Sequence, residues 1–288
     1  MRFVSFDKNG DPTLGVHIGD QVVDLSIAAP GLPKDLKGML EAGDQVMEQA
    51  NTAAQSASVG AKLPFASISF HPPIANSSKI ICLGLNYADH AAESGMEKPK
   101  FPTLFCRFGT SLVGHLQPVI RPKCSTLLDY EAELVAVIGK KGRHLSESDA
   151  LSIVAGYSVF NDGSVRDYQM RTTQWTMGKN FDASGPCGPE FVTADELPPG
   201  ASGLKIQARL NGEVLQDDNT ENMVFNVSET IAILTEALTL LPGDMLVMGT
   251  PSGVGAARKP PVWMKDGDTI EIEIDKIGVL TNPVVDEK

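Results

Sequence analysis

The sequence predicts a mixed α/β fold that is rich in β-strands, with a small N-terminal α+β domain before a larger one. Turn signals are dense along the chain, and the apolar runs between them are short. The chain holds 27 Gly and 19 Pro, while aromatic residues make up only 6% of it. Its 288 residues are enough to bury a large core in one domain plus a smaller one.

The N-terminal quarter is expected to form a domain of its own. Residues 1–26 alternate short apolar runs with turns, which favours strands, and residues 34–56 carry apolar side chains at roughly helical spacing. The two prolines after His71 predict an extended linker, because a residue before proline is disfavoured in a helix. We therefore predict a small N-terminal domain over residues 1–70 and a main domain over residues 74–288. The clearest helices of the main domain are expected at residues 146–154 and 228–240.

Composition argues against several classes of function. The formal net charge of −12 disfavours general binding to nucleic acids or to anionic membranes, which needs a basic surface. The four cysteines include no CxxC pair, which disfavours a zinc site or a disulfide scaffold and fits a reducing compartment. The sequence shows no signal peptide and no membrane-spanning run, so we expect a cytoplasmic location.

A pair of acidic residues gives the strongest indication of chemistry. Glu131 and Glu133 open an apolar strand over residues 134–138, and alternation along a strand should point both side chains to one face. Two carboxylates this close repel each other unless a cation lies between them or one is protonated. Such an oxygen pair is what Mg²⁺ prefers as ligands. On the spacing alone, an edge strand with a solvated acidic face explains the pair equally well.

A histidine–glutamate pair follows a predicted buried strand that ends at Gly84. A short helix closed by Gly95 would place His90 and Glu93 one turn apart. A carboxylate beside an imidazole orients the ring and raises its basicity, which suits a general base. A solvent-facing pair is the simpler interpretation of this spacing. The helix is too short to be stable alone, so it could also act as a lid.

A third group of polar residues follows an apolar strand predicted over residues 153–160. The strand ends just before Asp162 and would fix its carboxylate, although Asp162 could equally be an ordinary helix N-cap. Arg166 and Gln169 lie one turn apart if the segment after Gly163 is helical. Arginine can bind a substrate carboxylate in bidentate fashion, and glutamine can hold a carbonyl.

Two further segments carry polar residues that could serve a site. Lys179 lies among apolar and small residues, where a lysine is often a surface group; if buried, it needs an anionic partner such as a metal-bound carboxylate or an enolate. Residues 248–255 are glycine-rich but lack the lysine of a phosphate-binding loop. They could offer backbone N–H groups and the Thr250 hydroxyl to a carboxylate, or form a structural turn.

In their order along the chain, these segments resemble the fumarylacetoacetate hydrolase superfamily. The segments are NYADHAAE, DYEAEL, NDGSVRDYQ, GKNFD, NGEVLQ and GTPSGVG. The resemblance runs from about residue 74 to residue 285. Residues 258–268 look most like the subgroup of fumarylacetoacetate hydrolase domain-containing proteins that includes an oxaloacetate tautomerase. It implies a mixed β-sandwich roll with a small N-terminal domain, usually assembled as a homodimer.

The resemblance also implies roles for individual residues. The acidic residues that bind one Mg²⁺ or Mn²⁺ ion in the family correspond to Glu131, Glu133 and Asp162. The catalytic residues of the family correspond to His90, Glu93 and Lys179. Its substrate contacts correspond to Arg166, Gln169 and Thr250, to which we add Tyr87 and Arg107. Arg107 stands where many relatives have lysine, and Gly163 stands where many have valine or tryptophan, so both are expected to change the substrate pocket.

These roles imply a metal-dependent enzyme that acts on a small 2-oxo or 2,4-dioxo acid. We expect hydrolysis of a C–C bond in an acylpyruvate-type substrate through a metal-stabilised enolate. His90, held by Glu93, would activate water, and Lys179 would support the developing negative charge. The same enolate chemistry without water gives an oxaloacetate tautomerase or a decarboxylase as the alternative. A non-enzymatic binding protein is disfavoured because the ordered set of acidic, basic and dyad residues is complete.

Overall fold

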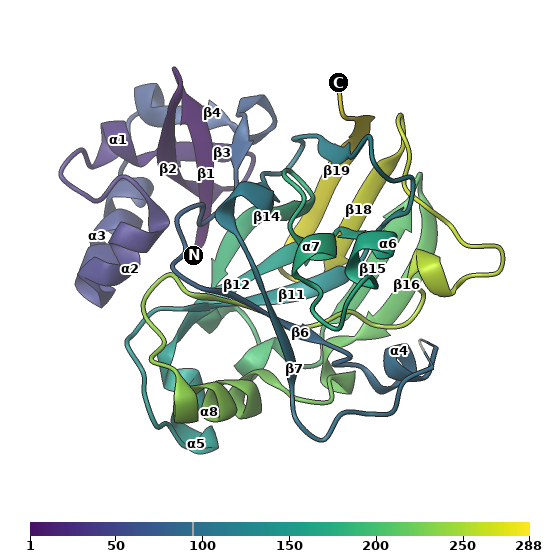
Figure 1. Cartoon of the computed structure of the whole chain (residues 1–288). Coiled ribbons are helices and arrows are strands. Elements are labelled where there is room, and N and C mark those ends of the chain that lie inside the picture. Colours follow the sequence, from purple (N-terminus) through teal and green to yellow (C-terminus); the bar gives the residue numbers. More distant parts are fainter. Residues whose placement is uncertain (94) are drawn as a thin grey trace.

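Strands dominate the structure, and most of its helices are short (Figure 1). It is a computed structural model in which residues 1–93 and 95–288 are described. The predicted mixed α/β, strand-rich class is confirmed. Within the described part of the chain, no helix combines the length and apolar character that crossing a membrane requires.

One large sheet runs through both halves of the chain. Its main path has the order β4-β3-β2-β1-β14-β12-β11-β17-β6-β7, with β5 beside β1 and β8 beside β14. The strands are β1 (Arg2–Lys8), β2 (Asp11–Ile18), β3 (Gln21–Asp24), β4 (Lys62–Pro64), β5 (Phe70–His71), β6 (Ile80–Gly84), β7 (Thr103–Arg107), β8 (Leu112–Val113), β11 (Ala132–Ile138), β12 (Val154–Asn161), β14 (Gly185–Thr193) and β17 (Met245–Val247). Because β1 pairs antiparallel with β14, the N-terminal strands continue the sheet of the main part. The domain boundary near residue 70 stays a prediction.

A second sheet of five strands covers β11 and β12. Its order is β16-β15-β18-β19-β9. The strands are β9 (Val119–Arg121), β15 (Lys205–Leu210), β16 (Glu213–Asn219), β18 (Thr269–Ile274) and β19 (Gly278–Asp286). Along β18, Ile270, Ile272 and Ile274 are buried in the same cluster as Leu134 of β11, while the glutamates between them face outward. This alternation, which has the period of a strand, seals one face of β11 and β12 from water.

The helices lie at the margins of the two sheets. They are α1 (Leu25–Ala28), α2 (Leu36–Ala42), α3 (Asp44–Gln55), α4 (Ala88–Glu93), α5 (Glu147–Ala150), α6 (Arg166–Gln169), α7 (Thr176–Lys179) and α8 (Val227–Ala237). Short 3₁₀ turns occupy Val59–Ala61, Phe65–Ser67, Gly109–Ser111, Leu151–Ile153, Ala194–Glu196, Pro199–Ala201, Thr220–Asn222 and Gly255–Ala257, and β10 (Leu128–Asp129) pairs with β13 (Ser164–Val165). The helical region expected over residues 34–56 is two helices, because Gly43 has φ +90° and ends α2.

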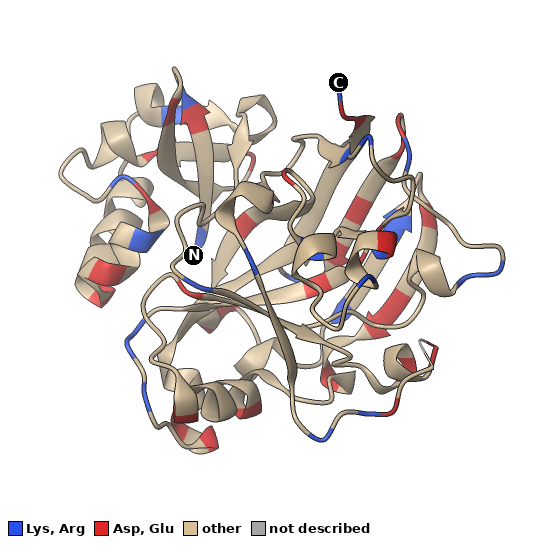
Figure 2. Cartoon of the chain, in the orientation of Figure 1, with Lys and Arg blue, Asp and Glu red and all other residues tan. Residues whose placement is uncertain are grey.

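Charged side chains are scattered over the outer elements, and a further group lies around the short helices α6 and α7 (Figure 2). Several charged side chains are buried, among them Glu131, Glu133 and Lys179. Buried charges are stable only when they are paired or bind an ion. These buried side chains therefore require ion-pair partners or a bound ion.

Asn86 joins three segments at the edge of this buried region. Its side chain has no exposed surface, and its amide donates to the carbonyls of Phe225 and Met248 at 3.0 and 2.7 Å. Its Oδ1 accepts from the backbone N–H of Phe225 at 2.8 Å. The turn after β6 is thus tied both to the segment before α8 and to the loop after β17.

We expect Asn86→Ala to lower the free energy of unfolding by about 3 kcal/mol, because a buried group that loses its hydrogen-bond partner costs about 1–3 kcal/mol. Urea unfolding followed by circular dichroism measures the change. The matched control is Asn76→Ala, at an exposed asparagine, which should shift the stability by no more than about 0.5 kcal/mol. Equal effects of the two substitutions would contradict this account of Asn86.

Candidate metal centre and active site

Three buried carboxylates meet where β11 begins and β12 ends. The antiparallel pairing of Ala132 with Asn161 brings Glu131, Glu133 and Asp162 together. One ligand oxygen from each lies within 4.8 Å of the others. Glu131 lies just before β11 and not inside the strand as expected, and its backbone N–H donates to Asn161 Oδ1 at 3.0 Å. This hydrogen bond therefore holds the backbone of Glu131 next to the end of β12, where Asp162 follows.

Asp162 is not the helix N-cap that the sequence left open, because α6 begins at Arg166 and its N-cap is Val165. The Asp162 carboxylate is completely buried and is bound by two cations from opposite sides. Arg107 Nη1 contacts Oδ1, and Lys179 Nζ lies 2.6 Å from Oδ2. The Asp162 side chain thus has a fixed orientation.

Lys179 is the cation that lies between the carboxylates. It is 2% exposed, and its Nζ is 2.6 Å from Glu131 Oε2 as well as from Asp162 Oδ2. Burial by itself lowers the pKa of a lysine, but the charges of Asp162 and Glu131 outweigh it and raise the pKa of Lys179 above its usual value. Lys179 therefore stays charged, and the interpretation of Lys179 as a snorkelling surface group is wrong.

Glu131 and Glu133 differ sharply in their surroundings. Burial alone would raise the pKa of Glu131, but Lys179 and Arg166 hold that pKa well below its usual range. Burial raises the pKa of Glu133, and the negative charges of Asp162 and Glu131 raise it further. Among the described residues Glu133 has no ion pair, and its Oε2 accepts a hydrogen bond from the Gly249 N–H at 2.6 Å.

Among the described residues, the buried charges around the triad leave one carboxylate without a fixed cation. Arg107, Lys179 and Arg166 are each paired with Asp129, Glu131 or Asp162. Glu133 is the carboxylate left over, and it is 1% exposed. Three converging carboxylates with one uncompensated charge form a donor set that fits a hard divalent cation such as Mg²⁺ or Mn²⁺.

Arg166 is held mainly by protein carboxylates. Its Nε donates to Asp129 Oδ2 at 2.8 Å, and its Nη2 lies 2.7 Å from both Asp129 and Glu131. Its Nη1 donates to Gln169 Oε1 at 2.9 Å, so the two residues lie on one helical turn as predicted. All three guanidinium nitrogens of Arg166 therefore contact protein side chains. The role of Arg166 in substrate binding stays a prediction.

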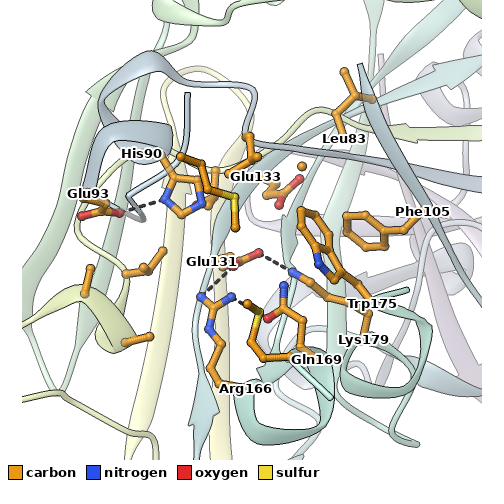
Figure 3. Close-up of a pocket in the computed structure, with 18 residues that line it drawn as sticks. Leu83, His90, Glu93, Phe105, Glu131, Glu133, Arg166, Gln169, Trp175 and Lys179 are labelled. Atoms are coloured by element: carbon orange, nitrogen blue, oxygen red, sulfur yellow. Dashed lines mark hydrogen bonds and ion pairs between the residues drawn. The ribbon is translucent and has the colours of Figure 1, made fainter. Parts of the chain in front are cut away.

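His90 and Glu93 form the expected pair on α4. The His90 Nδ1 lies 2.8 Å from Glu93 Oε1, and the other ring nitrogen faces the cavity (Figure 3). His90 is only 7% exposed, so the alternative of a solvent-facing histidine is wrong. Glu93 Oε2 accepts from the Gly253 N–H at 2.9 Å, and the carbonyl of Gly253 is bound by Tyr130 and Arg258. The pair is therefore attached to the loop after β17.

Most of the predicted site residues line one cavity of about 330 Å³. They come from α4, from the start of β11, from α6 and α7, and from the loop after β17 (Figure 3). They are His90, Glu93, Glu131, Glu133, Arg166, Gln169, Lys179 and Thr250. The cavity thus has a charged floor with an imidazole at one side.

Three residues do not occupy the places that the sequence suggested. Arg107, expected to contact substrate, does not line the cavity; its side chain is buried behind Asp162 and donates to Ser184 Oγ at 2.6 Å. Tyr87 is likewise buried and absent from the lining. Gly163 does not line the cavity, and a Cβ there would lie 2.1 Å from the carbonyl oxygen of Ser184; its effect on the pocket stays a prediction. Packing against this backbone is the reason for the glycine.

Two supporting residues were not assigned a role from the sequence. Asp129 accepts from the N–H groups of Gly255 and Ala256 at 2.8 and 2.9 Å and also holds Arg166. Gln216 accepts from the Ala132 N–H at 2.9 Å and donates to Thr250 Oγ1 at 2.8 Å. Asp129 lies in the segment DYEAEL and Gln216 in NGEVLQ. Their place in these two segments of the family resemblance was the sequence signal that could have identified them.

Comparison with known proteins agrees with this geometry. Residues 79–285 match the family model described as fumarylacetoacetate (FAA) hydrolase C-terminal. The chain belongs to the fumarylacetoacetate hydrolase family. It is 42% identical to the mitochondrial oxaloacetate tautomerase Fahd2a of Rattus norvegicus, over 99% of this chain and 92% of the rat protein.

Two solved structures of fumarylacetoacetate hydrolase relatives have the same fold. The fumarylacetoacetate hydrolase of psychrophilic Exiguobacterium antarcticum superposes with a TM-score of 0.85 at 32% identity, covering all of both chains. A maleylpyruvate hydrolase from Sphingobium sp. SYK-6, in complex with manganese(II) and pyruvate, superposes with a TM-score of 0.81 at 29% identity, again over all of both chains. The predicted family and fold are thereby confirmed.

We expect Glu133→Gln to abolish tight Mn²⁺ binding while the protein stays folded, because it removes the one carboxylate of the triad that has no cation partner. Isothermal titration calorimetry of the metal-free protein measures the affinity. The control is Glu213→Gln, at an exposed glutamate on β16, which should bind Mn²⁺ like the unmodified protein. Unchanged Mn²⁺ affinity in Glu133→Gln would remove this residue from the metal site.

Metal binding should release protons and strengthen as the pH rises. The pKa of Glu133 is raised, so the metal-free protein holds a proton there at pH values where an ordinary glutamate is ionised. A metal ion requires the ionised form and displaces that proton. Calorimetric titrations in two buffers of different ionisation enthalpy measure the number released. An affinity that is constant or falls with rising pH would show the opposite sign.

Proposed function

We propose that this protein is a divalent-metal-dependent tautomerase that interconverts the keto and enol forms of oxaloacetate or a closely related 2-oxo acid. The observation that carries the proposal is that Glu131 and Glu133, whose oxygens converge with one of the buried Asp162, line the same cavity as His90, whose Nδ1 is held by Glu93. The extensive identity with the rat protein named oxaloacetate tautomerase also supports it. The expectation of a hydrolase thus moves to second place.

Electrostatics favour an anionic substrate in this cavity. The buried group has four carboxylates, from Asp129 and the triad, and three cations. With Glu133 ionised, a divalent cation would bring the formal charge of this group to +1, although the whole chain carries −12. A local positive field of this kind attracts a 2-oxo carboxylate from solution.

The chain's own residues divide the remaining work. A divalent cation bound by the triad would supply Lewis-acid stabilisation of negative charge on the substrate. Lys179 holds Glu131 and Asp162 in place and keeps a positive charge beside the oxygen at C2. His90, whose Nδ1 is fixed by Glu93, presents its other nitrogen to the cavity and transfers the proton to or from C3. Gln169 and Thr250 line the same cavity, and in this proposal they would orient the carboxylate and carbonyl.

Hydrolysis of a C–C bond in an acylpyruvate-type substrate is the second candidate. The His90–Glu93 pair favours it, because an oriented imidazole can equally remove a proton from water. The maleylpyruvate hydrolase named above is a relative with this type of activity. Product analysis by NMR separates the two, since hydrolysis of acetylpyruvate releases acetate and pyruvate, whereas tautomerisation leaves the carbon skeleton intact.

The assembly and the compartment remain proposals. A homodimer is our expectation from the family resemblance, and size-exclusion chromatography with light scattering tests it. The rat relative is described as mitochondrial, so the cytoplasmic location expected for this chain needs its own measurement. The proposed partner is a small 2-oxo acid, and neither nucleic acid nor a membrane is part of the proposal.

The decisive assay follows the ultraviolet absorbance of enol-oxaloacetate as it converts to the keto form. We expect EDTA to abolish the enzymatic rate and Mg²⁺ or Mn²⁺ to restore it. His90→Ala should lower kcat by about 10²–10⁴, the scale for loss of a general acid–base, with Mn²⁺ affinity nearly unchanged. The control is Asp89→Ala, at an exposed neighbour on α4. A full rate after exhaustive EDTA treatment would refute the metal-dependent mechanism.

A further inference from the structure

The side of the cavity opposite the His90–Glu93 pair is an apolar wall, formed by Leu83, Phe105 and Trp175 (Figure 3). The rings of Phe105 and Trp175 lie edge to face, with centroids 5.6 Å apart and planes at 63°. Leu83 and Phe105 are buried, whereas Trp175 is half-buried. No part of the proposed tautomerase chemistry uses this wall.

The wall is held in place by its surroundings. A Cβ at Gly84 would lie 2.1 Å from Cζ3 of Trp175, so the glycine lets the indole pack directly against the end of β6. Phe105 lies within β7, and its ring packs against that of Trp175. The wall is therefore a preformed surface, which costs little conformational entropy when a ligand covers it.

The wall also lies next to the charged floor. Lys179 Nζ is 5.0 Å from the centroid of Phe105 and 2.6 Å from Glu131 Oε2. A group attached to C3 of a 2-oxo acid whose carboxylate and carbonyl lie over the triad would therefore reach the wall. Oxaloacetate carries a second carboxylate at that position, and a carboxylate gains nothing from apolar contacts.

The cavity has room for a larger substituent. Its volume of about 330 Å³ lies within the roughly 300–1,000 Å³ typical of small-molecule sites. An aromatic ring would bury apolar surface against Leu83 and pack edge-to-face or offset against the rings of Phe105 and Trp175. We propose that the site also accepts aryl-2-oxo acids such as phenylpyruvate, with Leu83, Phe105 and Trp175 as the subsite for the aryl ring.

This inference rests on the proposed function and extends it to a second substrate class. In the reaction the enol loses its O–H proton at C2 and gains a proton at C3. The C2–C3 double bond becomes single and the C2–O bond becomes double, so no oxidant or further reactant is needed. His90 serves the proton at C3 for either substrate, and the wall contacts the ring without taking part in the proton transfer.

Kinetics on the two substrates test the subsite. The enzyme should accelerate ketonisation of both enol-oxaloacetate and enol-phenylpyruvate, followed by ultraviolet absorbance in Mg²⁺ buffer. Trp175→Ala should lower kcat/KM for phenylpyruvate at least tenfold more than for oxaloacetate, with the larger part of the change in KM. Trp175→Phe keeps an aromatic ring, so its kcat/KM for phenylpyruvate relative to oxaloacetate should be close to that of the unmodified protein. The matched control is Trp263→Ala, at the other tryptophan, which does not line the cavity.

Binding gives a measurement that does not depend on turnover. In a Trp263→Phe protein, Trp175 is the only tryptophan, because the chain has two. Titration with 3-phenyllactate, which keeps the carboxylate and an oxygen at C2, should quench its fluorescence, whereas malate should quench it at least tenfold less effectively. The Trp175→Phe protein, which retains Trp263, should show no such response.

The outcomes separate this inference from the proposed function. Turnover of oxaloacetate without turnover of phenylpyruvate, or equal losses on both substrates in Trp175→Ala, would overturn the aryl subsite and leave the tautomerase proposal intact. If neither substrate is turned over, the proposed function fails, and the fluorescence titration then decides the subsite alone. Quenching of Trp175 by 3-phenyllactate supports it, and the absence of quenching overturns it.

Discussion

The contact of Lys179 with both Glu131 and Asp162 is the interaction on which the site depends. Three carboxylates converge where β11 and β12 meet, and without a buried cation their repulsion and desolvation would prevent this arrangement. Lys179 reaches them from α7, a one-turn helix that the sheet alone would not position. Arg107 forms an ion pair with the other carboxylate oxygen of Asp162. Lys179 and Arg107 therefore neutralise part of the buried negative charge, and the Glu133 carboxylate is left for an added cation.

The site combines a rigid part with a more exposed one. The triad lies where two paired strands in the middle of the large sheet begin and end, and β11 is buried along its whole length. The His90–Glu93 pair lies on a helix of six residues attached through one backbone hydrogen bond to the loop after β17. Such a division fits a reaction in which charge must be placed accurately while substrate enters and leaves.

The sequence predicted local features well and long-range partners poorly. The strand before Asp162 and the contact of His90 with Glu93 followed from side-chain periodicity, which depends on near neighbours in the chain. Arg107 was misplaced because its partner Asp162 is 55 residues away, and no local pattern reports such a distance. The apolar wall was missed for the same reason, since Trp175 meets Phe105 only through the packing of α7 on β7. The roles of the site residues themselves stay predictions.

Gly253 has a consequence for how variation in this chain should be interpreted. Its N–H binds Glu93, a donor that every residue except proline would retain. Yet its φ of +101° and a virtual Cβ only 2.3 Å from the carbonyl oxygen of Leu215 leave no room for a side chain. An invariant glycine at this position in a family alignment would therefore look like a mark of chemistry, whereas the constraint that fixes it is steric. Glu93 and not Gly253 would carry the information about catalysis.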